Sequence, residues 1–193
     1  MIINKFWQIF FLFLPVSYYF ISKSSLLTLF FPIAILLVLA DFLSKYNQNF
    51  AQVLLKFIKF DNLSNKISDL SYFTVACLLV ILFFNQSNAI NALLVAIICP
   101  ITGKIIEENF QMSDFFEKNL SFAVGFFASG VLILIANYAI LDLSFGYLFF
   151  ALIALIAATI IACRPSLSSI NPNFLLISSF ATTIGCFSLI WQI

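Results

Sequence analysis

The sequence contains no histidine and little charge, because only 9% of its 193 residues are Asp, Glu, Lys or Arg. The missing histidine excludes His-dependent catalytic triads, zinc sites of the H-E-x-x-H type and haem ligation by histidine. Soluble domains carry about 25% charged residues. This chain has too few charged residues to form a water-exposed surface, which excludes a soluble enzyme. The formal net charge of +1 provides no field that attracts nucleic acid, and we expect no nucleic-acid partner.

Several familiar motifs are also missing. The chain has no glycine-rich P-loop, no G-x-G-x-x-G after a strand and no G-x-S-x-G elbow. Its cysteines show no C-x-x-C spacing and lie in or beside apolar runs, so we interpret them as small packing residues. They are Cys77, Cys99, Cys163 and Cys186. With no histidine, the acid or base of any reaction must be a carboxylate.

Long apolar runs make up most of the chain, which is 63% hydrophobic with a mean hydropathy of +1.12. A helix of about 20 residues crosses the hydrocarbon core of a membrane, which is about 30 Å thick. Seven runs fit this length approximately: 6–22, 25–43, 70–85, 88–104, 119–138, 145–163 and 173–192. No small-residue cleavage site follows the first run, so we expect it to remain as a helix. The sequence therefore predicts an all-α, polytopic membrane protein with one domain over residues 1–193.

The basic residues predict how these helices are oriented. If every run crosses the membrane, eight of the nine Lys and Arg residues fall on one side and Lys23 falls on the other. The positive-inside rule then places the N-terminus in the cytoplasm and the C-terminus outside. The eight residues are Lys5, Lys45, Lys56, Lys59, Lys66, Lys104, Lys118 and Arg164. We expect a multi-pass protein of a bacterial inner membrane.

The cytoplasmic connector over residues 45–69 has its own pattern. Apolar residues recur there three and four positions apart beside two lysines, which is typical of an amphipathic helix on a membrane surface. The apolar positions are Phe50, Val53, Leu54, Phe57 and Ile58. The segment is either a simple connector or a gate for a lipid substrate.

Small residues and a proline mark the later runs. Ser121, Gly125 and Ser129 are four positions apart, as are Ala154, Ala158 and Ala162, and such stripes favour close contact between helices. Pro100 lies inside the fourth run and removes a backbone hydrogen bond, so we expect a kink there or an early helix end near Gly103. A broken helix can line a polar cavity, but membrane helices also tolerate proline as ordinary structure.

Charged residues near the predicted cytoplasmic side are the candidates for chemistry. Asp41 lies near the end of the second run, and six more charged residues follow the fourth run. These are Lys104, Glu107, Glu108, Asp114, Glu117 and Lys118. Mg²⁺ prefers oxygen ligands and phosphate prefers cations, so this cluster predicts a site for a metal ion and a nucleotide phosphate. The alternative is a charged, solvated loop without a ligand.

The order of elements over roughly residues 4–135 matches a known pattern. It runs through Asn4-Lys5-Phe6-Trp7-Gln8, then Pro15 and Tyr18-Tyr19, then Asp41, Lys45 and Asn49, then Ser71-Tyr72-Phe73 and Leu82-Phe83-Phe84. This order resembles the family of CTP-dependent lipid kinases that includes dolichol kinase, phytol kinase and yeast-type diacylglycerol kinase. These are multi-span proteins with a nucleotide site on cytoplasmic loops.

The resemblance implies an activity and its partners. The reaction would transfer a phosphoryl group from CTP to the hydroxyl of a polyprenol, another isoprenoid alcohol or diacylglycerol, with Mg²⁺ on the nucleotide phosphates. Carboxylates would act in catalysis, three of them as metal ligands, and lysines would bind the nucleotide. The metal ligands expected are Asp41, Glu107 and Glu108; Asp114 is a further catalytic carboxylate, and the lysines are Lys45, Lys104 and Lys118.

The sequence departs from this family at the positions that carry the chemistry. Gln8 replaces an early histidine, Pro100 replaces an aspartate, and Glu107, Gln111 and Phe122 replace glycines. Losing a metal-binding carboxylate, and glycines that let the backbone approach phosphates, is expected to weaken phosphoryl transfer. The first alternative is therefore a non-catalytic protein that binds lipid or supports another membrane protein.

A small-molecule transporter is the other alternative. It would need polar residues inside the apolar runs, and the sequence offers Asn91, Asn137 and scattered serine and threonine. Inverted transporter halves would show as an internal repeat or as a corresponding pair of interrupted helices, and the sequence contains neither.

Overall fold

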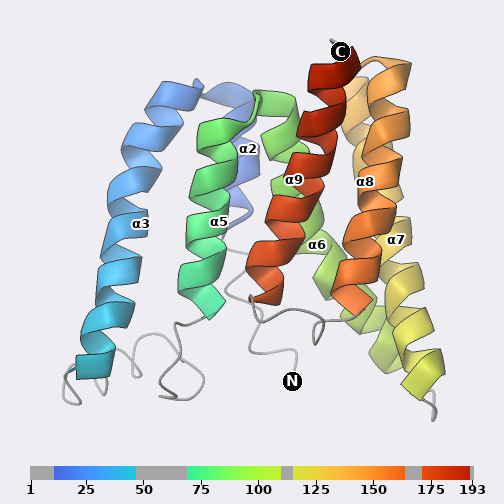
Figure 1. Cartoon of the computed structure of the whole chain (residues 1–193), viewed down its shortest axis with the longest axis horizontal. Helices are drawn as coiled ribbons and strands as arrows, with labels where there is room; N and C mark the ends of the chain where they lie inside the picture. The colour runs from blue at the N-terminus through green and yellow to red at the C-terminus, as the bar shows by residue number, and fades with distance from the viewer. Residues whose placement is uncertain (1–10, 47–68, 110–114, 164–170, 192–193) are drawn as a thin grey trace.

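A computed structural model describes residues 11–46, 69–109, 115–163 and 171–191. Within these ranges the chain forms seven helices and no strand (Figure 1), which confirms the all-α prediction. The helices are α2 (Phe13–Phe20), α3 (Lys23–Tyr46), α5 (Asp69–Phe83), α6 (Gln86–Asn109), α7 (Phe115–Ile140), α8 (Phe145–Cys163) and α9 (Pro172–Trp191).

Each of these helices lies on one of the seven predicted apolar runs. The agreement is closest at α8, whose ends coincide with the predicted 145 and 163. Of the two alternatives expected at Pro100, the early helix end near Gly103 is wrong, because α6 continues through Pro100 and Gly103 to Asn109. The kink stays a prediction. The predicted surface helix of the connector lies outside the described residues, apart from its first two positions and residue 69.

Among the described residues, four helical segments are long and apolar enough to cross a membrane: Lys23–Leu43, Gln86–Asn109, Asn119–Ile140 and Phe145–Cys163. Shorter apolar segments occur in α5 and α9, at Ser71–Phe83 and Phe174–Phe187. Large apolar side chains point outward on several helices, and Leu36 and Leu132 are 66% and 69% exposed. Such outward faces suit a hydrocarbon surrounding, so the helices have the character of a membrane protein.

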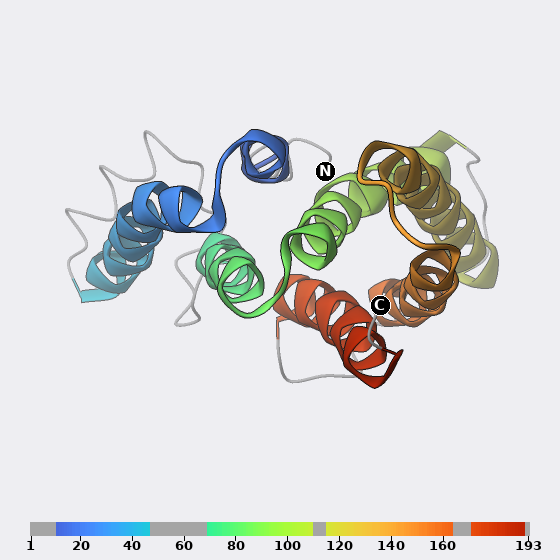
Figure 2. The same cartoon turned by 90° about the horizontal axis from the view of Figure 1, so that it is seen from above.

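Helix α6 occupies the centre of the bundle. It packs against α2, α5, α7 and α9, and most of its residues from Asn88 to Pro100 are buried. Seen from above, α2, α3 and α5 lie to one side of α6, and α7 and α8 lie to the other (Figure 2). Helix α3 forms one edge of the array and packs mainly on α5. The upper end of Figure 1 contains the α2–α3, α5–α6 and α7–α8 connections.

The contact between α6 and α7 depends on two glycines. A Cβ atom added to Gly125 would lie 3.0 Å from the Cα of Gly103 and 2.8 Å from the Cδ1 of Ile106. Next to this crossing, the hydroxyl oxygens of Thr102 and Ser129 are 2.7 Å apart. The small-residue contact predicted for this stretch of α7 is therefore confirmed. The close packing also gives a physical reason for α6 to continue past Pro100, since α7 supports the helix there.

Candidate functional site

Asp41 is a buried charged residue, with 6% of its surface exposed. It lies near the C-terminal end of α3, at the end of a segment apolar enough to cross a membrane. A carboxylate is costly to bury without a partner, and one in a membrane helix is a functional candidate by default. Lys45 is four residues further along α3, so the backbone places both residues on one side of the helix.

Lys104, Glu107 and Glu108 lie in the last turns of α6. Their spacing of three and four residues places them on one side of the helix. Glu108 is exposed, and Lys104 and Glu107 are half-buried. These residues are helical and do not belong to a loop after the fourth run, because α6 extends to Asn109 instead of ending at 104. This corrects the sequence-based loop assignment for Glu107 and Glu108.

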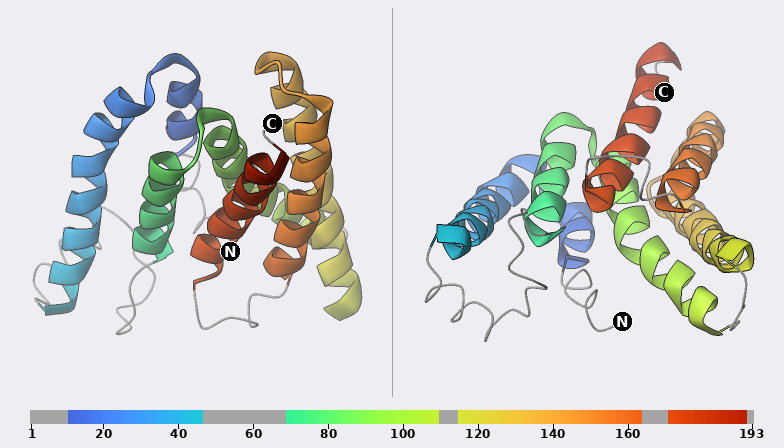
Figure 3. Two further views of the ribbon diagram at one scale, coloured as in Figure 1. Left: turned by 45° about the horizontal axis from the view of Figure 1, so that its top comes forward. Right: turned by 60° about the horizontal axis from the view of Figure 1, so that its bottom comes forward.

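The two groups of charged residues lie on different sides of the bundle. The C-terminal end of α6 lies beside the N-terminal end of α7, away from α3 (Figure 3). Lys118 belongs to the first turn of α7 and is therefore placed on the same side as Lys104. Asp114 lies outside the described residues. The structure thus associates Lys104, Glu107 and Glu108 with the start of α7, and it does not bring Asp41 to them.

Mg²⁺ commonly binds through one or two carboxylates together with the phosphates of a substrate. Glu107 and Glu108 are consecutive residues of α6, and the helix directs their side chains about 100° apart. Their binding of an ion stays a prediction from the sequence. In the part of the chain that the structure describes, no group of three or more Cys, Asp or Glu residues could hold a metal ion by itself. The metal role of Asp41 stays a prediction from the sequence.

A chain of polar side chains joins four helices near the opposite end of the bundle. The Nδ2 of Asn137 donates to the Oδ1 of Asn91 over 2.6 Å, and the Nδ2 of Asn91 donates to the hydroxyl of Tyr147 over 3.0 Å. The hydroxyl of Tyr19 donates to the Oδ1 of Asn137. Asn91 and Asn137 are 0% and 3% exposed. The amides contact one another and the two tyrosines, so this arrangement connects the four helices.

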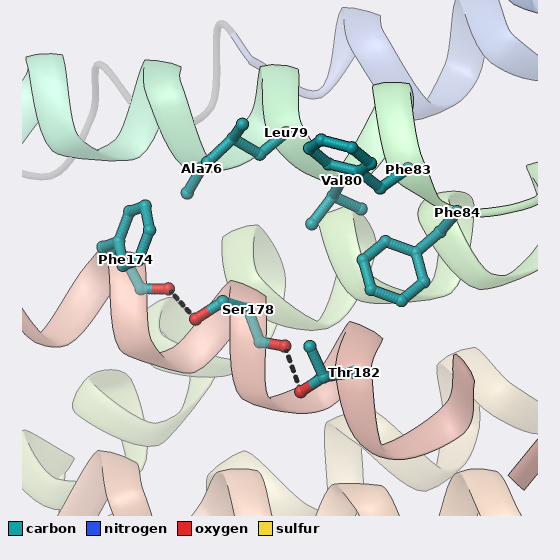
Figure 4. Close-up of a pocket in the computed structure, with 8 residues that line it drawn as sticks. All are labelled: Ala76, Leu79, Val80, Phe83, Phe84, Phe174, Ser178 and Thr182. Carbon is teal, nitrogen blue, oxygen red and sulfur yellow. Dashed lines mark hydrogen bonds between the residues drawn. The ribbon is translucent and has the colours of Figure 1, made fainter. Parts of the chain in front are cut away.

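An apolar groove lies between α5 and α9 (Figure 4) and has a volume of about 300 Å³. It is lined by Ala76, Leu79, Val80, Phe83, Phe84, Phe174, Ser178 and Thr182. The hydroxyls of Ser178 and Thr182 donate to the carbonyl oxygens of Phe174 and Ser178 in their own helix, over 2.8 and 2.7 Å. With these hydroxyls satisfied, the groove suits a hydrocarbon ligand.

Comparisons with protein-family models, curated proteins and solved structures found no match to this chain. Function is therefore inferred from the residues and their geometry. The sequence indicates the charged end of α6 but not the groove, since most of the lining residues are ordinary apolar residues in two separate runs. Asn91 and Asn137 stand out in the sequence as polar residues inside apolar runs, but their spacing does not predict that they are partners. The two tyrosines that extend this pair gave no separate signal in the sequence.

Proposed function

We propose that this chain is a membrane-embedded lipid kinase-like protein of the dolichol kinase type. It would transfer the terminal phosphoryl group of CTP to the hydroxyl of a polyprenol, another isoprenoid alcohol or diacylglycerol. The observation that carries the proposal is the charged end of α6, where Lys104, Glu107 and Glu108 share one side of the helix. Two carboxylates and a cation are the groups that a nucleotide with its metal ion requires.

The roles of these residues follow from their chemistry. Glu107 and Glu108 would hold Mg²⁺, which neutralises charge on the phosphates when it is bound. Lys104 would orient the terminal phosphate, and Lys118 at the start of α7 would assist it. The lipid oxygen forms a bond to phosphorus, the bond to the leaving CDP breaks, and the hydroxyl proton passes to a carboxylate or to water.

We also propose that all seven helices cross a bacterial inner membrane, with the N-terminus in the cytoplasm and the C-terminus outside. The support is the distribution of basic residues, because Lys23 alone falls on the other side of a seven-span arrangement. Helix α3 starts at Lys23, while Lys104 lies near the opposite end of α6. This orientation would give the charged end of α6 access to cytoplasmic CTP.

One observation favours a second candidate, a non-catalytic protein that binds lipid or supports another membrane protein. Gly103 is enclosed by α7, since a Cβ atom there would lie 2.9 Å from the ring of Phe122. Pro100 is buried in the same stretch of α6. Phe122, which stands in place of one of the family's glycines, thus packs against α6 here.

A phosphotransfer assay on the purified protein in lipid separates the two candidates. The protein is supplied with γ-labelled CTP or ATP and Mg²⁺, with undecaprenol, phytol, farnesol or diacylglycerol as the acceptor. Label in the solvent-extracted lipid with CTP supports the kinase. No transfer and no CTP binding by folded protein would overturn it in favour of the non-catalytic candidate.

A further inference from the structure

Lys23 is the one basic residue that falls on the other side of a seven-span arrangement, and its side chain contacts Phe84, a residue that lines the apolar groove. Its Nζ donates a hydrogen bond to the carbonyl oxygen of Phe84 over 3.1 Å. The ring of Phe84 lines the groove between α5 and α9. One residue therefore contacts the ammonium group through its backbone and borders the apolar groove through its side chain.

The ammonium group of Lys23 retains binding capacity. It has three N–H donors, and the carbonyl of Phe84 accepts from one of them. Among the described residues, no carboxylate forms an ion pair with it. The contact with Phe84 also places a positive charge just beyond the C-terminal end of α5, where the helix dipole favours a cation. Lys23 thus stabilises the end of α5 and still offers donors to an anion.

The groove provides the second half of a site for an amphiphile. Its volume of about 300 Å³ lies at the lower end of the range for small-molecule sites, about 300–1,000 Å³. Phe83 on its rim is 72% exposed, so the groove borders an outward apolar surface. On the α9 side, Gly185 lets the ring of Phe84 lie close, since an added Cβ atom would be 2.6 Å from that ring.

We propose that the α5–α9 groove and Lys23 together bind one anionic membrane lipid. A hydrocarbon chain of the lipid occupies the groove, and its phosphate group pairs with the ammonium of Lys23. Charge complementarity selects an anionic headgroup, because an uncharged lipid alcohol would leave the lysine unpaired. This site is distinct from the proposed kinase site, since Lys104 and the two glutamates lie at the far end of α6.

Native mass spectrometry of the full-length protein in detergent tests this proposal. The protein is titrated with dioleoylphosphatidate, with dioleoylglycerol and with inorganic phosphate, and the apparent Kd of the first bound molecule is measured. We expect one phosphatidate to bind about tenfold more tightly than dioleoylglycerol, as one charge-assisted contact would provide. Inorganic phosphate in excess should not displace the lipid.

Four variants assign the two halves of the site. Lys23→Gln retains a donor for the Phe84 carbonyl and should weaken phosphatidate binding about tenfold without changing that of dioleoylglycerol. Lys23→Arg should bind as the wild type does. Thr182→Trp fills the groove from an exposed position and should weaken both lipids. Leu132→Trp adds the same side chain to α7, away from the groove, and should weaken neither.

Unchanged phosphatidate binding by both Lys23→Gln and Thr182→Trp would overturn the proposal and leave only unspecific contact with surrounding lipid. Displacement of phosphatidate by inorganic phosphate would also overturn it, by assigning Lys23 to a free anion. Dioleoylglycerol and phosphatidate are also an acceptor and the product of the proposed kinase reaction. The Lys23 and Thr182 variants lie away from the proposed kinase site and therefore assign the binding to the groove. Failure of the lipid site and failure of the kinase proposal are therefore distinguishable.

Discussion

The side-chain amide of Asn137 on α7 donates to the side-chain oxygen of Asn91 on α6 over 2.6 Å, inside the helical bundle. Tyr19 and Tyr147 extend this pair to α2 and α8. Hydrogen bonds between membrane helices contribute only about 0.6 kcal/mol on average. A buried polar group that loses its partner costs more, about 1–3 kcal/mol. The network therefore matters chiefly because breaking it leaves buried groups unsatisfied.

Asn137→Leu is expected to lower the free energy of unfolding by about 1–3 kcal/mol, because it leaves Asn91 and Tyr19 without this partner. Denaturant unfolding of the purified protein in detergent measures the change. Ser179→Ala is the control, since that hydroxyl bonds only to a carbonyl of its own helix among the described residues. The double variant Asn91→Leu with Asn137→Leu should cost less than the sum of the single changes. Additive costs would contradict a direct coupling.

The Gly103–Gly125 contact gives a second prediction. Gly125→Leu should force α6 and α7 apart and destabilise the protein by about 2–5 kcal/mol or prevent folding, since a Cβ atom already meets Gly103 and Ile106. Ala128→Leu is the matched control, because Ala128 lies on the exposed side of the same helix. Melting temperatures of the two variants give the comparison. Equal stability would show that this crossing is not closely packed.

The sequence predicted where the helices lie, because each helix needs a run of apolar residues long enough to be recognised. It did not predict which helices are neighbours, since almost every helix is apolar on all sides and packing between small residues decides the contacts. By their chemistry alone, Asp41 and Glu107 suit one metal ion. The two carboxylates are separated because α6 lies at the centre of the bundle and α3 lies at its edge. The hydropathy of the sequence does not predict that arrangement.

The charged end of α6 can be tested directly. Replacing Glu107 and Glu108 together by Gln should reduce CTP-dependent transfer about 100-fold or more, because the carboxylates that hold the ion are lost while side-chain size is retained. Asp142→Asn is a matched control at the opposite end of the bundle, and asparagine tolerates the positive φ of 49° at that position. Full activity of the double variant would contradict the assignment.

The orientation of the bundle gives a further prediction. In a background without the native cysteines, Ser24→Cys and Asn109→Cys introduce thiols at exposed positions near opposite ends of the described helices. A membrane-impermeant maleimide added to intact spheroplasts should label position 24 and leave position 109 unlabelled until the membrane is permeabilised. Labelling of position 109 in intact spheroplasts would reverse the proposed topology.

The most direct test of the account is the transfer of γ-label from CTP to a lipid alcohol by the purified protein in lipid with Mg²⁺. Undecaprenol, phytol, farnesol and diacylglycerol are the acceptors, and the variant with Gln at both 107 and 108 is assayed in parallel. We predict label in the extracted lipid for the wild type and its loss in the variant. No label from folded wild-type protein, together with no CTP binding, would contradict the proposed kinase.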